Sequence, residues 1–119
     1  MFKKINGYTI DFNRRLIWGP VQGSMNWDKA KVLEKDGWRL PTSEELKQAF
    51  IDEVLGFTKS WFWSSTPYEN FTDYVWTVNF GFGIPYYTYK DDYCLTRYVQ
   101  PLNSSILEVL GVIKNLEVL

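Results

Sequence analysis

Apolar residues recur at every second position early in the chain, which predicts a β-hairpin over residues 7–18. Its first half has the pattern of a strand with one buried face, at Tyr8, Ile10 and Phe12. A turn at residues 13–15 leads to the second half, Leu16-Ile17-Trp18. Gly19-Pro20 is expected to end this strand, because both residues interrupt regular pairing.

After the hairpin, two segments carry apolar residues at the spacing of an α-helix. The first helix is predicted to start after Asn26, whose side chain can cap free backbone N–H groups. Gly37 is expected to close it, because glycine readily takes the left-handed conformation. The second helix is predicted to start after Thr42, which has with Glu45 the spacing of a capping box. Its buried stripe is expected at Leu46, Ala49, Phe50 and Val54.

The segment between the helices, residues 37–46, is expected to organise the rest of the chain. Pro41 fixes its own φ and favours an extended geometry for the residue before it. Arg39 is expected to bridge the turn by donating to carbonyl groups. We predict structural roles for residues of this turn and of the strands laid against it: Trp38, Arg39, Pro41, Thr42, Glu45, Trp63 and Trp76.

From Trp61 onward the pattern changes to strands and turns. Strands are predicted at residues 61–63, 74–80, 84–89 and 93–99. Fourteen of the twenty-two aromatic residues lie between Trp61 and Val99. Aromatic side chains fill cores, but they also dominate binding hot spots. This half of the chain is therefore the candidate binding region.

The C-terminal segment, residues 103–119, differs in character, and we treat it as an amphipathic tail on a domain of residues 1–102. Ser105 and Glu108 have the spacing of a capping box. A helix would place five apolar residues on one face: Ile106, Val109, Leu110, Ile113 and Leu116. A hairpin is the alternative, because residues 107–110 recur as 116–119. We expect the helix, buried against the domain or forming a homo-oligomer contact.

Composition and charge limit which partners and which cellular compartment we expect for this chain. A net charge of −1 gives no long-range attraction to nucleic acid or to an anionic membrane, so neither is expected as a partner. No stretch approaches the roughly 20 apolar residues of a membrane span, and the N-terminus lacks the apolar run of a signal peptide. The single cysteine indicates a reducing compartment. We expect a cytoplasmic protein, or one assembled into a virion there.

Four motifs in order resemble the DUF1566 domain, also called the Lcl C-terminal domain: Met25-Asn26-Trp27 with Ala30, Gly37 to Thr42 with Glu45-Leu46, Trp63 to Thr66, and Trp76 to Phe80. That domain is similar to the formylglycine-generating sulfatase-modifying and C-type-lectin-like group. The resemblance spans residues 8–100. It implies an α+β, C-type-lectin-like fold with two helices packed on small twisted antiparallel sheets and a long loop-rich region. Such domains recur in bacterial surface proteins and bacteriophage genomes.

The residues offer little for catalysis. The chain has no His, the commonest general base and metal ligand. Formylglycine-generating chemistry needs paired thiols on a soft metal, and Cys94 is alone. Oxygen ligands for calcium could be assembled from Glu69, Asn70, Asp73 and Asn79, but without the motifs of calcium-dependent lectins. We therefore predict no catalytic residue, no metal and no cofactor.

What remains is recognition by exposed rings. Residues 84–89 carry tyrosines on both strand faces, so one set is expected to face solvent unless the strand is buried on both sides. Tyrosine gives wide contact area at little entropic cost. The predicted binding residues are Tyr68, Phe71, Phe82, Tyr86, Tyr87, Tyr89 and Tyr93.

We predict a non-enzymatic module that binds a protein partner, for example a phage-encoded inhibitor of a host protein. One alternative is a virion or tail component that binds a receptor or a glycan. The other is an enzyme of the formylglycine-generating type.

Overall fold

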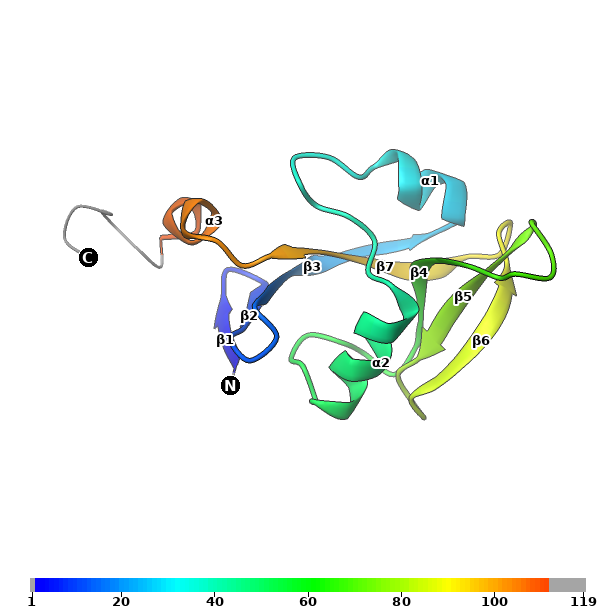
Figure 1. The fold of residues 1–119 in the computed structure, drawn as a ribbon, viewed down its shortest axis with the longest axis horizontal. Coiled ribbons are helices and arrows are strands. Elements are labelled where there is room, and N and C mark those ends of the chain that lie inside the picture. Colours follow the sequence, from blue (N-terminus) through cyan, green and yellow to red (C-terminus); the bar gives the residue numbers. More distant parts are fainter. Residues whose placement is uncertain (1, 112–119) are drawn as a thin grey trace.

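Seven strands form one mixed sheet in the computed structural model, which describes residues 2–111 (Figure 1). The strands are β1 (Phe2–Ile5), β2 (Tyr8–Asp11), β3 (Leu16–Met25), β4 (Trp61–Pro67), β5 (Tyr74–Asn79), β6 (Ile84–Tyr89) and β7 (Cys94–Pro101). Their order across the sheet is β1-β2-β3-β7-β4-β5-β6. Strand β7, the last of these seven along the sequence, thus lies between two sets of three strands.

The predicted C-type-lectin-like fold, with two helices packed on small twisted antiparallel sheets, is wrong, because the strands form one mixed sheet. Strand β7 pairs antiparallel with β3, for example at Trp18 and Val99, and parallel with β4 at Phe62 and Leu95. Because β7 bonds to both sets of strands, the sequence's two antiparallel groups become a single sheet. The β4–β5 connection between Pro67 and Tyr74 is short, so the long loop-rich region is also absent from the described residues.

Helices α1 (Trp27–Val32) and α2 (Ser43–Ile51) lie on opposite sides of this sheet (Figure 1). Each helix closes a separate buried cluster. Leu46 and Ala49 of α2 pack with residues that include Phe62 and Val99. On the other face, Ala30 of α1 packs in a second cluster with side chains that include Leu40, Trp63 and Cys94. The sheet is therefore buried on both faces at its centre and becomes exposed toward β6.

Both helix starts were predicted correctly. Asn26 accepts from Lys29 N at 3.0 Å, and Thr42 and Glu45 form the expected capping box. The prediction that Gly37 closes the first helix is wrong. Helix α1 ends at Val32, and Gly37 lies in a later turn with φ +85°.

The hairpin of residues 7–18 is confirmed, but its second strand runs on to Met25. Gly19-Pro20 does not end it, because shifts of the β3–β7 register after Trp18 accommodate both residues.

The turn between the helices is held by hydrogen bonds on both sides. Arg39 exchanges backbone hydrogen bonds with Val99 at 3.1 and 2.9 Å. Its guanidinium donates to both oxygens of Glu45, at 2.8 and 2.9 Å, and to the carbonyl of Leu40 at 3.3 Å. The carbonyl of Pro41 accepts from Ser65 N at 2.8 Å. These contacts fasten the start of α2 to β7 and β4.

The three predicted structural tryptophans take different positions. Trp38 lies against Gly19, and its ring is 5.6 Å from that of Tyr8. Trp63 is fully buried and donates from Nε1 to the carbonyl of Met25 at 2.7 Å. Trp76 is half-buried on the outer part of the sheet, where it contributes to the surface described below.

A buried arginine, which the sequence pattern did not suggest, joins three strands and a loop. Arg97 of β7 is 1% exposed, and the three acceptors of its hydrogen bonds are neutral. It donates to Gly19 O at 2.6 Å, Leu55 O at 2.8 Å and Thr9 Oγ1 at 3.0 Å, and its guanidinium lies 4.6 Å from the ring of Phe57. Burial lowers the pKa of Arg97 to about 10.

The predicted apolar C-terminal helix is wrong. Helix α3 (Ser104–Val109) has six residues, none of them buried, and Gly111 follows it with φ +78°. Its cap is Asn103, which accepts from Ile106 N at 2.9 Å, and not Ser105. The predictions that concern residues 112–119 lie outside the described part of the chain. The treatment of residues 103–119 as a separate tail stays a prediction.

Candidate functional site

The outer part of the sheet carries a continuous set of aromatic rings on β5, β6 and the loop before β5. We call it the ring surface and define it as Tyr68, Phe71, Tyr74, Trp76, Tyr86, Tyr87 and Tyr89. The register of the β5–β6 ladder builds it, because Tyr74 lies opposite Tyr89 and Trp76 lies opposite Tyr87. Cross-strand neighbours on one face are close enough for their rings to touch.

Tyr68 is at the centre of the ring contacts. Its ring stacks on that of Tyr87, with centroids 4.7 Å apart, and meets the edge of Trp76 at 5.3 Å. Phe71 stacks on Tyr68 at 6.2 Å and lies 5.9 Å from Tyr74. Since each ring is supported mainly by other rings, the surface is pre-arranged while its outer faces stay open.

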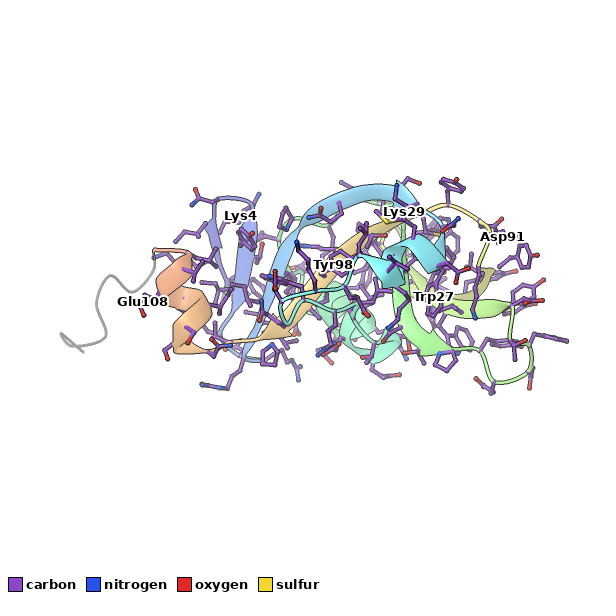
Figure 2. All side chains as sticks on the ribbon, turned by 90° about the horizontal axis from the view of Figure 1, so that it is seen from above. Lys4, Trp27, Lys29, Asp91, Tyr98 and Glu108 are labelled. Atoms are coloured by element: carbon purple, nitrogen blue, oxygen red, sulfur yellow. The ribbon has the colours of Figure 1, made fainter. Side chains whose placement is uncertain are left out.

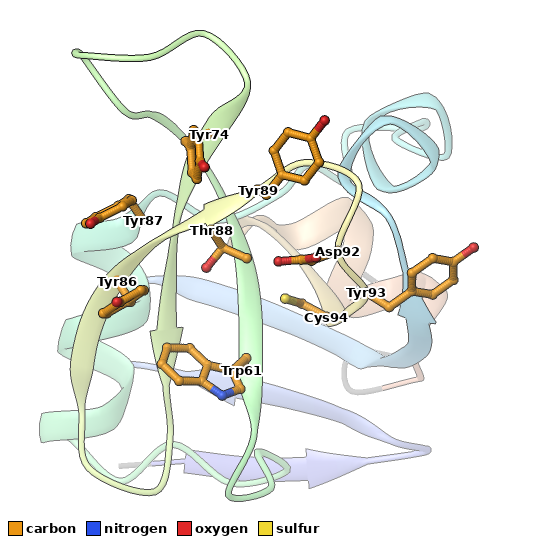
Figure 3. Close-up of a pocket in the computed structure, with 9 residues that line it drawn as sticks. All are labelled: Trp61, Tyr74, Tyr86, Tyr87, Thr88, Tyr89, Asp92, Tyr93 and Cys94. Atoms are coloured by element: carbon orange, nitrogen blue, oxygen red, sulfur yellow. The ribbon is translucent and has the colours of Figure 1, made fainter.

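An open groove of about 650 Å³ adjoins the ring surface (Figure 3). It is bordered by strands β4 and β6 and by the β6–β7 loop. Its lining residues are Trp61, Tyr74, Tyr86, Tyr87, Thr88, Tyr89, Asp92, Tyr93 and Cys94. Trp61 meets the ring of Tyr86 edge-on at 5.7 Å, so the groove is continuous with the ring surface.

Five of the seven predicted binding residues belong to the ring surface. Tyr86, Tyr87 and Tyr89 are 50%, 41% and 41% exposed, which means that β6 is not buried on both sides. Phe71 is also exposed, and Tyr68 is half-buried beneath its neighbours.

The other two predicted residues lie apart. Tyr93 borders the groove from the β6–β7 loop, where it is 70% exposed and its ring points away from the other lining residues (Figure 3). Phe82 is 75% exposed in the turn at the opposite end of β6 and belongs to no ring contact among the described residues. The structure therefore separates Phe82 from the ring surface.

Sequence reasoning missed five residues that line the groove: Trp61, Tyr74, Thr88, Asp92 and Cys94. Trp61 carried a usable signal, because it alternates with the buried Phe62 at the start of a strand. The position of Asp92 depends on how the β6–β7 loop folds back, which no local pattern indicates.

The border of the ring surface is acidic. Glu69 and Asp73 lie in the loop that carries Phe71, and Asp91 and Asp92 follow Tyr89. The negative charge of Asp91 raises the pKa of the Tyr89 hydroxyl. The adjacent cation, Lys90, is turned toward α1, with its Nζ 4.7 Å from the ring centroid of Trp27. Figure 2 labels Trp27 on α1 and Asp91 on the loop after β6. The border thus favours a partner with positive charge.

Cys94 is buried, and burial together with the charge of Asp92 raises the pKa of its thiol to about 12, so it is not a thiolate at neutral pH. Residues 2–111 contain no group of three His, Cys, Asp or Glu side chains able to hold a metal ion. Within the same residues, no helix is long and apolar enough to cross a membrane.

A family model described as the Lcl C-terminal domain matches residues 7–100. The match takes in β2 through most of β7 and therefore both the frame around Arg39 and the ring surface. None of the curated proteins matches the chain.

Proposed function

The chain belongs to the Lcl C-terminal domain family, and we propose that it is a non-enzymatic module that binds a protein partner through the ring surface. One observation supports this most directly: Tyr86, Tyr87 and Tyr89 are exposed, yet their rings are held by neighbouring rings. Tyrosines fixed in this way offer large amphipathic contact areas at little cost in side-chain entropy.

The acidic border indicates the chemistry of the partner. Positive charge on the partner would be complementary to Glu69, Asp73, Asp91 and Asp92, while the tyrosines would contact its apolar groups. Arginine suits both roles, because its planar guanidinium stacks on rings and pairs with carboxylates. We therefore propose that the partner presents an arginine- or lysine-bearing patch, and that binding weakens as ionic strength rises.

The test uses the full chain as immobilised bait in a lysate of the cells in which the protein occurs. The ring variant carries Tyr86→Ser, Tyr87→Ser and Tyr89→Ser. A matched control carries Phe82→Ser, Val32→Ser and Val109→Ser, which remove three exposed apolar side chains elsewhere. We expect the natural chain and the control to retain the same protein, identified by mass spectrometry, and the ring variant to lose it.

Retention of that protein by the ring variant would contradict the proposal, as would its loss from the control. A large drop in melting temperature of the ring variant would mean that the rings support the fold instead. Capture of a glycan that the ring variant loses would favour the receptor- or glycan-binding alternative. An inhibitor encoded by a bacteriophage is one specific form of the proposal, and the genes flanking the coding sequence would test it.

A further inference from the structure

Strand β6 leaves one side of its backbone unpaired at the end of the sheet. Among residues 2–111 it bonds only to β5, since the sheet order ends with β5-β6. Residues 84–89 carry no charge, whereas the strand at the opposite edge, β1, carries Lys3 and Lys4. Natural proteins usually protect an edge strand with charged residues, because an unprotected edge pairs readily with another strand. The backbone of the β6 edge is therefore open to strand addition once the rings of Tyr86 and Tyr87, which stack 5.1 Å apart beside this edge, turn back onto their own faces of the sheet.

The register fixes which backbone groups point outward. Lys90 N–H donates to Asp73 O at 2.8 Å, which makes this pair a hydrogen-bonded pair of the β5–β6 ladder. Hydrogen-bonded pairs alternate along antiparallel strands, so Ile84, Tyr86 and Thr88 direct their backbone groups toward β5. Pro85, Tyr87 and Tyr89 direct theirs outward. This agrees with the position of Pro85, which has no N–H to give to β5.

Part of this outer edge is already satisfied. The carbonyl of Tyr89 accepts from Asp92 N at 2.9 Å in the turn that follows the strand. Pro85 supplies only a carbonyl. The groups that remain for an added strand are the carbonyl of Pro85, both groups of Tyr87 and the N–H of Tyr89.

We propose that this edge pairs with the same edge of a second copy of the chain, antiparallel and with Tyr87 on the two-fold axis. In that register Tyr87 exchanges both hydrogen bonds with Tyr87 of the second copy. Tyr89 N–H donates to the carbonyl of Pro85 of the second copy. The N atom of Pro85, which has no proton, faces the carbonyl of Tyr89 of the second copy, which already has a donor in its own turn.

This self-complementarity distinguishes a second copy from an unrelated strand. An unrelated strand would place one of its carbonyl groups opposite the nitrogen of Pro85, which has no proton to donate. That carbonyl would stay without a hydrogen bond, and an unsatisfied buried carbonyl is costly. The side chains also fit, because Tyr86 would lie opposite Thr88 and Tyr89 opposite Pro85, with no like charges in contact. Pairing through the backbone edge leaves both faces of the sheet open. The proposed dimer therefore does not depend on the proposed function. It would place the ring surfaces of the two copies side by side.

The experiment measures the mass of the full chain by light scattering and sedimentation over a range of concentrations. We expect a dimer at high concentration. Tyr87→Pro removes the central N–H and should give a monomer, whereas Tyr87→Ser keeps the backbone donor and should remain a dimer. Val109→Asp changes an exposed apolar residue of α3 and tests association through the tail; it should also remain a dimer.

Amide hydrogen exchange of the natural chain gives a second measurement. The N–H groups of Tyr87 and Tyr89 should gain protection with concentration, while those of Tyr86 and Thr88 are protected at every concentration. The proposal is overturned by a monomer at all concentrations, by a dimer that survives Tyr87→Pro, or by dissociation through Val109→Asp. Dissociation of both Tyr87 variants would show that the ring, and not the strand edge, makes the contact.

Discussion

Glu45 should contribute far more to stability than its neighbour Glu44, although both are acidic residues in the first turn of α2. Glu45 Oε1 accepts from Thr42 N and from Arg39 Nη1, both at 2.8 Å, and Oε2 accepts from Arg39 Nη2 at 2.9 Å. In Glu45→Gln the amide nitrogen would face Nη2, so one charge-assisted bond is lost. Such a bond contributes about 1.5–3 kcal/mol.

Because the Arg39 side chain is 40% exposed, we reduce the expected loss for Glu45→Gln to about 1–2 kcal/mol. At about 4 °C per kcal/mol for a domain of this size, the melting temperature falls by about 4–8 °C. The control is Glu44→Gln, which makes the same change beside the same helix dipole. Glu44 is 82% exposed, and its contact with Lys47 is long, at 3.5 Å between Oε1 and Nζ. Glu44→Gln should therefore lower the free energy of unfolding by no more than about 0.5 kcal/mol.

The difference should also depend on pH. Burial alone would raise the pKa of Glu45, but the hydrogen bonds from Arg39 and Thr42 lower it below its ordinary value of 4.5. The contribution is therefore fully present above pH 4.5 and is lost as pH falls through the lowered pKa of the folded state. Urea unfolding of both variants from neutral pH to about pH 2 measures this. Equal stability of the two variants at neutral pH, or a constant gap down to the lowest pH, would refute the reasoning.

Two further changes test the frame. Arg97→Met removes the donors to Gly19 O and Leu55 O and should lower the free energy of unfolding, measured in urea, by about 3 kcal/mol. The control, Arg14→Met at the surface, should lower it by less than about 0.5 kcal/mol. Gly83→Ala places a methyl group 2.3 Å from the ring of Phe50 at φ +72° and should cost about 2–4 kcal/mol. In Gly7→Ala, at φ +85°, the new methyl group would make only an ordinary contact with Pro20, at 3.5 Å. This variant should therefore lose only the backbone strain of about 1–2 kcal/mol. A Gly83 variant no less stable than the Gly7 variant would contradict the predicted clash.

Local features could be predicted because local residues determine them. Asn26 and Thr42 start helices through side-chain contacts three residues away, and residues 84–89 form a strand as their alternation indicates. The sheet could not be predicted in the same way. Its order depends on β7 entering between β3 and β4, which involves a parallel register between Phe62 and Leu95 more than thirty residues apart. Alternation within one strand does not identify its neighbours.

The candidate site shows the same division. The tyrosines of β6 were predicted as binding residues because their type and density are unusual. Their grouping follows from the β5–β6 register, which also removes Phe82 from the group. Arg97 escaped notice because its surroundings come from β2, β3 and the loop after α2, and a single arginine in a strand gives no sign of burial.

The stability of the frame and the presentation of the rings are physically separate in this molecule. The buried clusters centre on β3, β4 and β7, where α1 and α2 close both faces of the sheet. Phe71, Tyr86, Tyr87 and Tyr89 belong to neither cluster and contact other rings instead. Substitutions among these four should therefore change binding with little change in unfolding free energy, whereas Glu45 and Arg97 should do the opposite. A surface that can vary without loss of the fold is the property expected of a recognition scaffold.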